Sequence, residues 1–372
     1  MRILSLQLEN FRNYKAQSLE LTDDDIQLFV GLNGSGKTNL LEAVSVLSLT
    51  KSCRDKDDSD MTLWGESHFR IKARVRADNG VESVMEAVTQ LEPRKRKAVF
   101  INDVRSTLSD VIGFLPTVTF LPQDLELFSG SPSERRRFLD QLLSQVSPEY
   151  FIQLSHCQKI LQQRNALLKR INAGEESPDS LDLWDREFAC RAATVTLGRL
   201  QLIGTLDMSF VQELASLGER WDDVDLRYER RTTATEQSEL EQEIVSLLRA
   251  NRERDIIVQT TSVGPHREDW QAFRNGHALP SFASRGQERV CVLALLLLEV
   301  SYLELRRGEK PVILLDDAFS ELDDPHQEAL IRGFAGYQTL MTATRVPPNA
   351  DRPALFTVDR GSVQQADTVL VG

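Results

Sequence analysis

Cysteine is scarce in this sequence, and the few cysteines are not arranged as a metal site or a disulfide framework. Cys53, Cys157, Cys190 and Cys291 lie far apart and form no C-x-x-C pair, so a zinc knuckle is not expected. A chain of 372 residues can build its core without disulfides. We therefore expect free thiols and a reducing compartment.

Long hydrophobic runs are also missing. The most apolar run covers residues 290–298 and ends at Glu299, whereas a helix that spans a bilayer needs about 20 residues. The first ten residues, MRILSLQLEN, alternate apolar and polar side chains and lack the apolar core of a signal peptide. These absences predict a cytoplasmic protein without a membrane partner.

The sequence also lacks an excess of positive charge. Lys and Arg number 44 against 56 Asp and Glu, which gives a net charge of −12 and excludes a globally basic, histone-like protein. A local basic surface is not excluded, because a binding partner responds to the local field. The segment 69–105 carries nine Lys or Arg against five Asp or Glu, and it has the alternating pattern of antiparallel strands.

Two interpretations of this basic segment remain open. One is the solvated face of a sheet, which is the usual role of a charge run. The other is a surface that contacts DNA phosphates without reading sequence. The candidate DNA-binding residues are Arg70, Lys72, Arg74, Arg76, Arg94, Lys95, Arg96 and Lys97.

What the sequence does contain is the pattern of an α/β protein with two or three domains. A strand at residues 27–30 leads into a Gly-rich loop, and helical spacing of apolar residues follows from Leu40. Buried strands return late, at residues 312–315, 338–342 and 355–358. Between them, residues 131 to about 255 are mainly helical, beginning with a capping box at Ser131 and Glu134 and including a strand near 223–231.

The Gly-rich loop has the spacing G-x-x-x-x-G-K-T between a strand and a helix, which is the context that a phosphate-binding P-loop requires. Its backbone N–H groups would point at phosphates, Lys37 would reach the β- and γ-phosphates, and Thr38 would bind Mg²⁺. A nucleoside triphosphate with Mg²⁺ is therefore the predicted ligand, and the resemblance given below implies ATP. The candidate residues are Gly31, Leu32, Asn33, Gly34, Ser35, Gly36, Lys37, Thr38 and Asn39.

Two further segments carry groups that suit a nucleotide site. Asp316 and Asp317 follow a four-residue apolar strand, where a P-loop fold holds its Mg²⁺-linked acid. Asp316 is the candidate for the metal, and Asp317 is the candidate for positioning or deprotonating the attacking water. Ser284, Gly286 and Gln287 lie at a predicted helix N-terminus, which is either a plain cap or an anion site that closes over a nucleotide held by another chain.

The order of these motifs resembles the ABC-type ATPases, in the DNA-repair branch that includes the SMC proteins, and within it the RecF family of recombination mediators. The blocks that carry the resemblance span nearly the whole chain in order. They are LENFRNY (8–14), GLNGSGKTNLLEA (31–43), FLPQDLELFSGSPSERRRFLD (120–140), VGPHRED (263–269), SRGQE (284–288) and LLDDAFSELDD (314–324).

The resemblance implies an ABC-type head, with a mixed sheet core and an antiparallel sheet, and an inserted, mainly helical lobe. The expected parts are residues 1–130 and 300–372 for the ATPase lobe and 131–299 for the helical lobe, which ends in the signature motif. It also implies that Lys37, Asp316, Asp317 and Gln123 act in catalysis, and that Gln123 senses Mg²⁺ beside Thr38 and Asp316. Nucleotide contacts are implied for Arg12, for the signature residues Ser284, Gly286 and Gln287, and for Asp323 with Ser320 and Leu322 in the D-loop.

Two departures from the broader ABC class bear on activity. Asp317 stands where the class has Glu, and this shorter side chain predicts slow hydrolysis. The switch histidine is absent from residues 341–345, and Thr344 is a candidate for the group that replaces it. His266, in the block 263–269, has no identifiable carboxylate or nucleophile partner, so we interpret it as a structural turn residue.

By resemblance, an ATP-driven homodimer binds double-stranded and gapped DNA and helps RecO and RecR to load RecA in DNA repair, replication restart and the SOS response. A slow ATPase stimulated by DNA is expected. The first alternative is another ABC-type ATPase, such as a transporter subunit, which the basic segment and the missing histidine disfavour. A nuclease-linked ATPase is the second, and the 48 residues after the D-loop leave no room for a nuclease domain.

Overall fold

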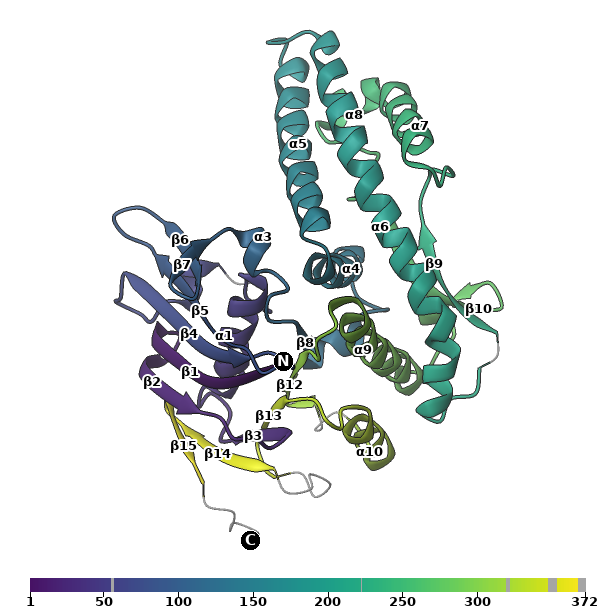
Figure 1. Cartoon of the computed structure of the whole chain (residues 1–372). Coiled ribbons are helices and arrows are strands. Elements are labelled where there is room, and N and C mark those ends of the chain that lie inside the picture. The colour runs from purple at the N-terminus through teal and green to yellow at the C-terminus, as the bar shows by residue number, and fades with distance from the viewer. Residues whose placement is uncertain (55–56, 222, 319–321, 347–352, 367–372) are drawn as a thin grey trace. The chain divides into compact units, whose positions relative to one another are not determined.

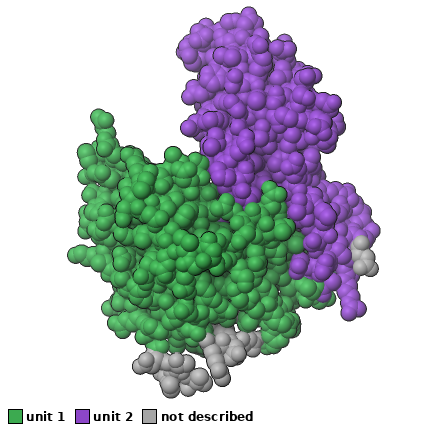
Figure 2. Space-filling view, viewed as in Figure 1, with its two compact units in different colours: residues 1–125, 216–219, 289–372 green, residues 126–215, 220–288 purple. Residues whose placement is uncertain are grey.

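The computed structural model describes residues 1–54, 57–221, 223–318, 322–346 and 353–366 (Figure 1). The chain forms two compact units (Figure 2): unit 1 comprises residues 1–125, 216–219 and 289–372, and unit 2 comprises residues 126–215 and 220–288. The sequence placed the boundaries at 130/131 and 299/300. The difference at the second boundary arises because helix α9 (Arg285–Arg307) belongs to unit 1 from Arg289 onward.

Unit 1 contains a mainly parallel sheet with the strand order β15-β14-β3-β13-β12-β8. Only β15 runs antiparallel to its neighbour, so the other five strands end at the same edge. Every residue of β12 and β13 is buried, as expected for strands covered on both faces. The strands are β3 (Ile26–Val30), β8 (Thr117–Phe120), β12 (Val312–Asp316), β13 (Thr339–Ala343), β14 (Ala354–Asp359) and β15 (Ser362–Gln365).

A second sheet in unit 1 is antiparallel, with the order β2-β1-β4-β5-β6-β7. It confirms the antiparallel strands predicted for residues 69–105. Asn102 and Asp103 form the turn between β6 and β7, and their φ angles of 50° and 62° suit a tight hairpin. The strands are β1 (Arg2–Phe11), β2 (Tyr14–Glu20), β4 (His68–Arg76), β5 (Glu82–Gln90), β6 (Arg96–Ile101) and β7 (Val104–Ser106).

Helix α1 (Lys37–Leu49) packs against both sheets, since it contacts β12 and β13 on one side and β4 and β5 on the other. Its residues 40–48 are all buried. The helix begins directly after the Gly-rich loop, so the two sheets together fix that loop at the carboxyl edge of the parallel sheet. Short helices α2 (Asp58–Met61), α3 (Leu108–Val111) and α10 (Asp324–Gly333) complete unit 1.

Unit 2 is mainly helical, as predicted, and also holds a small antiparallel sheet. Its helices are α4 (Pro132–Val146), α5 (Pro148–Asn172), α6 (Leu181–Ser216), α7 (Gln237–Ala250) and α8 (Arg252–Val258). The capping box at Ser131 and Glu134 is formed at the start of α4. The predicted strand near residue 223 is β9 (Val224–Glu229), which pairs with the unpredicted β10 (Asp269–Arg274); β11 (His277–Ala278) was also not predicted.

A fully buried arginine joins the elements of unit 2. Arg164 of α5 donates to Asp185 of α6 at 2.8 Å, to Asp255 of α8 at 2.9 Å, and to the Thr261 hydroxyl at 2.8 Å. A buried guanidinium is tolerated only when it is paired in this way. Among the described residues, no helix combines the length and apolar character needed to cross a bilayer.

Candidate nucleotide-binding site

Two hairpin turns hold the Gly-rich loop in place. From the β1–β2 turn, the Asn13 amide donates to the Ser35 carbonyl at 2.9 Å, and the Tyr14 hydroxyl donates to the Gly36 carbonyl at 3.0 Å. From the β14–β15 turn, the Gly361 N–H donates to the same Ser35 carbonyl at 3.1 Å. Gly36 has a φ of 118°, and a Cβ there would lie within 3 Å of Asn13 and Tyr14, so only glycine fits.

Lys37 is buried inside the loop that it follows. Its ammonium donates to the carbonyls of Gly31 at 2.8 Å and Leu32 at 3.1 Å. No carboxylate among the described residues forms an ion pair with it. The charge is therefore offset only by two neutral carbonyls, and phosphate oxygens would bind it more strongly.

The strand carrying Asp316 brings this residue against the start of α1. The Thr38 hydroxyl lies 2.8 and 2.9 Å from the two carboxylate oxygens of Asp316. The Thr342 hydroxyl donates to Asp316 at 2.7 Å and accepts the Asp317 N–H at 2.9 Å. Asp317 has a φ of 46°, a conformation that non-glycine residues rarely adopt. Thr342, which sequence reasoning missed, thus fixes both acids.

Gln123 lies at the same edge of the parallel sheet. It follows β8 in a short 3₁₀-helix (Pro122–Glu126), and β8 pairs with β12, the strand that ends in Asp316. Its side chain is exposed. The Asp124 carboxylate accepts the Leu121 N–H at 2.7 Å and fixes the turn. The structure therefore brings the Gly-rich loop, Gln123 and Asp316 to one edge.

Arg12 is engaged by a carboxylate rather than left free for phosphate. It makes a two-pronged contact with buried Glu42 of α1, at 2.7 and 2.5 Å. Arg54 and Ser52 also donate to Glu42. Burial acts to raise the pKa of Glu42, but these hydrogen bonds outweigh it and hold the pKa below its usual range. Sequence reasoning singled out Arg12 and missed the acid that holds it.

The predicted signature and D-loop residues have local structural roles. Ser284 and Gln287 form reciprocal hydrogen bonds at the start of α9, at 3.1 and 3.3 Å, as in a helix cap, and Gly286 follows in its first turn. Asp323 caps α10 by accepting the His326 N–H at 3.3 Å. Ser320 lies outside the described residues. Nucleotide contacts by these residues therefore stay a prediction.

The basic face of β4 alternates as predicted, but acids from neighbouring elements accompany it. Each of its four basic side chains has a carboxylate within 4.0 Å: Arg70 and Lys72 share Glu86, Arg74 meets Glu20, and Arg76 meets Asp23. In the second cluster, Lys95 and Lys97 share Asp58. Lys97 also donates to the Thr50 carbonyl and is mostly buried. Arg94 and Arg96 are exposed, with no ion pair among the described residues.

His266 is packed as the sequence interpretation expects. Its Nε2 lies 2.9 Å from the Thr261 carbonyl, and its ring makes an edge contact with Phe188. Burial lowers the pKa of His266 to about 4. A neutral ring that donates to a backbone carbonyl suits a structural residue.

Comparison with known proteins decides the family. The model of the RecF/RecN/SMC N-terminal domain matches residues 2–343. The DNA replication and repair protein RecF of Geobacillus thermodenitrificans (strain NG80-2) is 36% identical over 375 residues, which cover 98% of this chain and 99% of that protein. The chain belongs to the RecF family.

Solved structures agree with this assignment. A recombination mediator protein RecF bound to ATP, described as part of the RecFOR pathway, superimposes with a TM-score of 0.90 at 30% identity over 98% of this chain and 97% of that one. An Smc head domain superimposes with a TM-score of 0.55 at 15% identity, which supports the fold alone. The predicted ABC-type head with an inserted helical lobe is confirmed.

Proposed function

We propose that this RecF-family chain binds ATP with Mg²⁺ and hydrolyses it slowly to ADP and phosphate. The observation that carries the proposal is the contact of the Thr38 hydroxyl with both carboxylate oxygens of Asp316. It joins the end of the P-loop to the acid at the end of β12, the arrangement that P-loop ATPases use. The ATP-bound RecF structure among the neighbours supports the choice of nucleotide.

Binding of ATP would exchange the contacts of Lys37. Its ammonium leaves the carbonyls of Gly31 and Leu32 and meets the β- and γ-phosphates, while the loop N–H groups meet the remaining oxygens. Thr38 and Asp316 offer oxygen ligands of the kind that Mg²⁺ prefers, so this pair fits the metal, with exposed Gln123 at the same edge. Bound Mg²⁺ would neutralise charge on the β- and γ-phosphates.

For hydrolysis, Asp317 orients and deprotonates the attacking water. The hydrogen bond from its N–H to Thr342 fixes its backbone beside Asp316. An aspartate reaches less far than the glutamate of the broader ABC class, so a slow rate is expected.

The proposed cellular role is recombination mediation. ATP joins two chains, with Ser284, Gly286 and Gln287 of each contacting the nucleotide of the other, and the dimer binds double-stranded or gapped DNA without sequence preference. DNA stimulates hydrolysis, and the dimer assists RecO and RecR in loading RecA during repair, replication restart and the SOS response. The names of the relatives and the RecFOR pathway of the neighbouring structures support this role.

The test is Lys37→Arg. A planar guanidinium cannot replace a compact ammonium inside the closed loop, so we expect ATP turnover and ATP-dependent dimerisation to fall at least tenfold. Turnover of purified protein and sedimentation with ATP and Mg²⁺ measure the two effects. The matched control is Lys51→Arg, because Lys51 is exposed beyond the end of α1. Unchanged turnover in Lys37→Arg would contradict the proposed site.

A further inference from the structure

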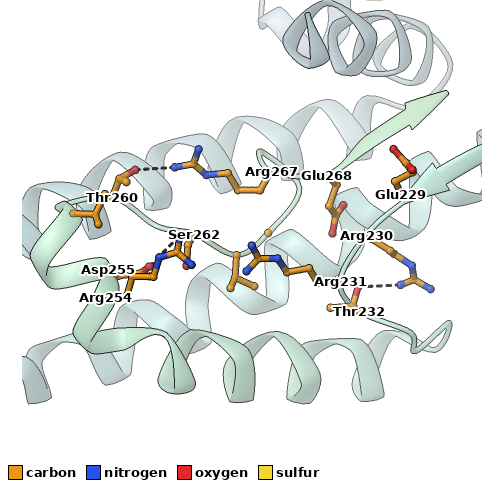
Figure 3. A pocket seen from close by; sticks show the side chains of 13 residues that line it. Glu229, Arg230, Arg231, Thr232, Arg254, Asp255, Thr260, Ser262, Arg267 and Glu268 are labelled. Atoms are coloured by element: carbon orange, nitrogen blue, oxygen red, sulfur yellow. Dashed lines mark hydrogen bonds between the residues drawn. The ribbon is translucent and has the colours of Figure 1, made fainter. Parts of the chain in front are cut away.

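A hollow of about 610 Å³ in unit 2 is lined by four arginines (Figure 3). It forms where the chain leaves β9, beside helix α8 and the loop that leads to β10. The volume lies in the range of pockets that hold small ligands. The arginines are Arg230, Arg231, Arg254 and Arg267.

No carboxylate among the described residues forms an ion pair with these arginines. By contrast, Arg135, Arg164, Arg199 and Arg252 of the same unit are each paired with aspartate. In a chain with a net charge of −12, unpaired arginines gathered in one hollow are unexpected.

Two of the three acids that line the hollow are occupied elsewhere, and the third, Glu229, is exposed. Asp255 accepts from Arg164 at 2.9 Å and from the Ser262 N–H at 3.2 Å. Glu268 accepts hydrogen bonds from Tyr228 at 2.6 Å and Thr196 at 2.8 Å. Burial raises the pKa of Glu268.

The four arginines divide into two pairs. Arg230 donates to the Ala234 carbonyl at 2.7 Å and Arg267 to the Thr261 carbonyl at 3.1 Å, so these two hold loops in place. The side chains of Arg231 and Arg254 are exposed and have no hydrogen bond to any described residue, and Figure 3 shows them reaching toward each other across the hollow. Two guanidinium groups that face each other repel unless an anion lies between them.

A second observation points to a ligand. Ser262 lines the hollow, and its buried hydroxyl has no hydrogen-bond partner among the described residues. A buried polar atom is rarely left in this state. Hydrogen bonds hold the loop that carries Ser262. The Thr261 hydroxyl accepts from the buried Arg164, and the Thr261 carbonyl lies 2.9 Å from His266 Nε2. The Ser262 hydroxyl is therefore fixed in position and suited to donate a hydrogen bond to an oxygen of a ligand.

We propose that this hollow binds a phosphate group, held by Arg231, Arg254 and the Ser262 hydroxyl. Phosphate oxygens accept paired hydrogen bonds from guanidinium groups, and three oxygens can serve the three donors. The site belongs to unit 2, whereas the P-loop belongs to unit 1, so the proposal does not depend on ATP hydrolysis. The phosphate comes either from a free oligophosphate or from a nucleic-acid backbone.

The test measures tripolyphosphate binding by isothermal titration calorimetry in full-length Lys37→Ala protein, which removes the P-loop's own contribution. We expect one remaining site. Adding R231A with R254A should weaken it at least tenfold, whereas adding R220A with R249A, which removes the same charge from exposed positions of unit 2, should leave it unchanged. No remaining site, or equal affinity in the two variants, would overturn the proposal.

Two further measurements complete the experiment. Arg231 and Arg254 hold no part of the fold, so the thermal unfolding midpoint should be unchanged in R231A with R254A. A blunt duplex without terminal phosphates identifies the source: displacement of tripolyphosphate supports a backbone phosphate, and retention supports a free oligophosphate. The effect of Lys37→Ala on the P-loop is measured by comparison with the wild type, and the effect of R231A with R254A is measured within Lys37→Ala. A wrong assignment of the nucleotide site and a wrong assignment of this hollow therefore give different results.

Discussion

At the residue scale, Thr342 is the side chain that sets the geometry of both acids. Its hydroxyl donates to Asp316 and accepts the Asp317 N–H, although the three residues lie on two different segments. Removing one hydroxyl therefore removes two hydrogen bonds and leaves a partly buried N–H without its acceptor, which costs about 1–3 kcal/mol.

We predict that Thr342→Val lowers the free energy of unfolding by about that amount and slows ATP turnover, because valine has the same shape but no hydroxyl. Urea unfolding and a turnover assay measure the two effects. Thr235→Val is the matched control, since Thr235 is exposed in unit 2. A larger loss of turnover in Thr344→Val would instead support Thr344 as the replacement for the switch histidine.

At the scale of elements, helix α9 carries a carboxyl group in an apolar setting. Glu299 is buried among the leucines of this helix, and burial, with a smaller contribution from Asp124, raises its pKa to about 8. The unfolded chain loses this proton near the ordinary value of 4.5, whereas the folded chain keeps it to about 8. The folded state therefore binds more protons in that window, and stability falls as the pH rises through it.

We predict that Glu299→Gln removes this fall, because glutamine keeps the shape but cannot ionise. Relative to the wild type, the free energy of unfolding of the variant should increase between pH 5 and pH 8, by up to about 1.4 kcal/mol per pH unit. Urea unfolding at several pH values measures the gain. Glu328→Gln, at an exposed position of α10, should follow the wild type, and parallel pH profiles for wild type and Glu299→Gln would contradict the prediction.

The proposed DNA surface comprises strand β4 and the β5–β6 connection. The ion pairs of its basic residues predict how strongly each residue contributes to DNA binding. Exposed pairs contribute only about 0–1 kcal/mol each, so DNA phosphates can compete with Glu86 and Glu20. We predict that Lys72→Ala with Arg74→Ala binds DNA less tightly, with a shallower dependence on salt. Arg94→Ala with Arg96→Ala should lower the slope more, by up to about 1.8, because no acid among the described residues pairs with these two.

Fluorescence anisotropy with duplex DNA at several salt concentrations measures these slopes. ATP binding without DNA serves as the control and should stay normal in both double variants. Unchanged slopes in both would assign the face of β4 to solvent. The sequence also contains a run of three arginines at residues 135–137. It would not serve as a free basic surface, because Arg135 pairs with Asp269 and Arg136 donates to the Glu268 carbonyl.

The elements that the sequence predicted are those with a strong local pattern. Strands β3 and β12 are apolar runs, α1 has helical spacing, and β4 alternates strictly, so each could be recognised without its neighbours. Strand β2 and the pair β10–β11 mix polar and apolar residues and were missed. The P-loop and the two acids follow from motif spacing. The contacts of Asn13, Glu42 and Thr342 could not be predicted, because they depend on long-range packing.

At the scale of the whole molecule, the proposed function depends on how two chains associate. We predict that Asp317→Asn leaves ATP binding intact but increases the dimer fraction with ATP and Mg²⁺, because asparagine keeps the shape and loses the charge that orients water. Sedimentation velocity compares the variant with wild type. A variant that remains monomeric with ATP would show that Asp317 does not act in hydrolysis.

The position of β3 has a consequence for synthesis of the protein. Both neighbours of this strand, β13 and β14, lie about 300 residues later in the chain, and the Gly361 N–H that holds the Ser35 carbonyl comes later still. The strands of the antiparallel sheet are all contained in the first 106 residues. At about 5–20 residues per second, a ribosome exposes a complete antiparallel sheet tens of seconds before the nucleotide site can close. A nascent chain therefore acquires its ATP site only after residue 361 has been synthesised.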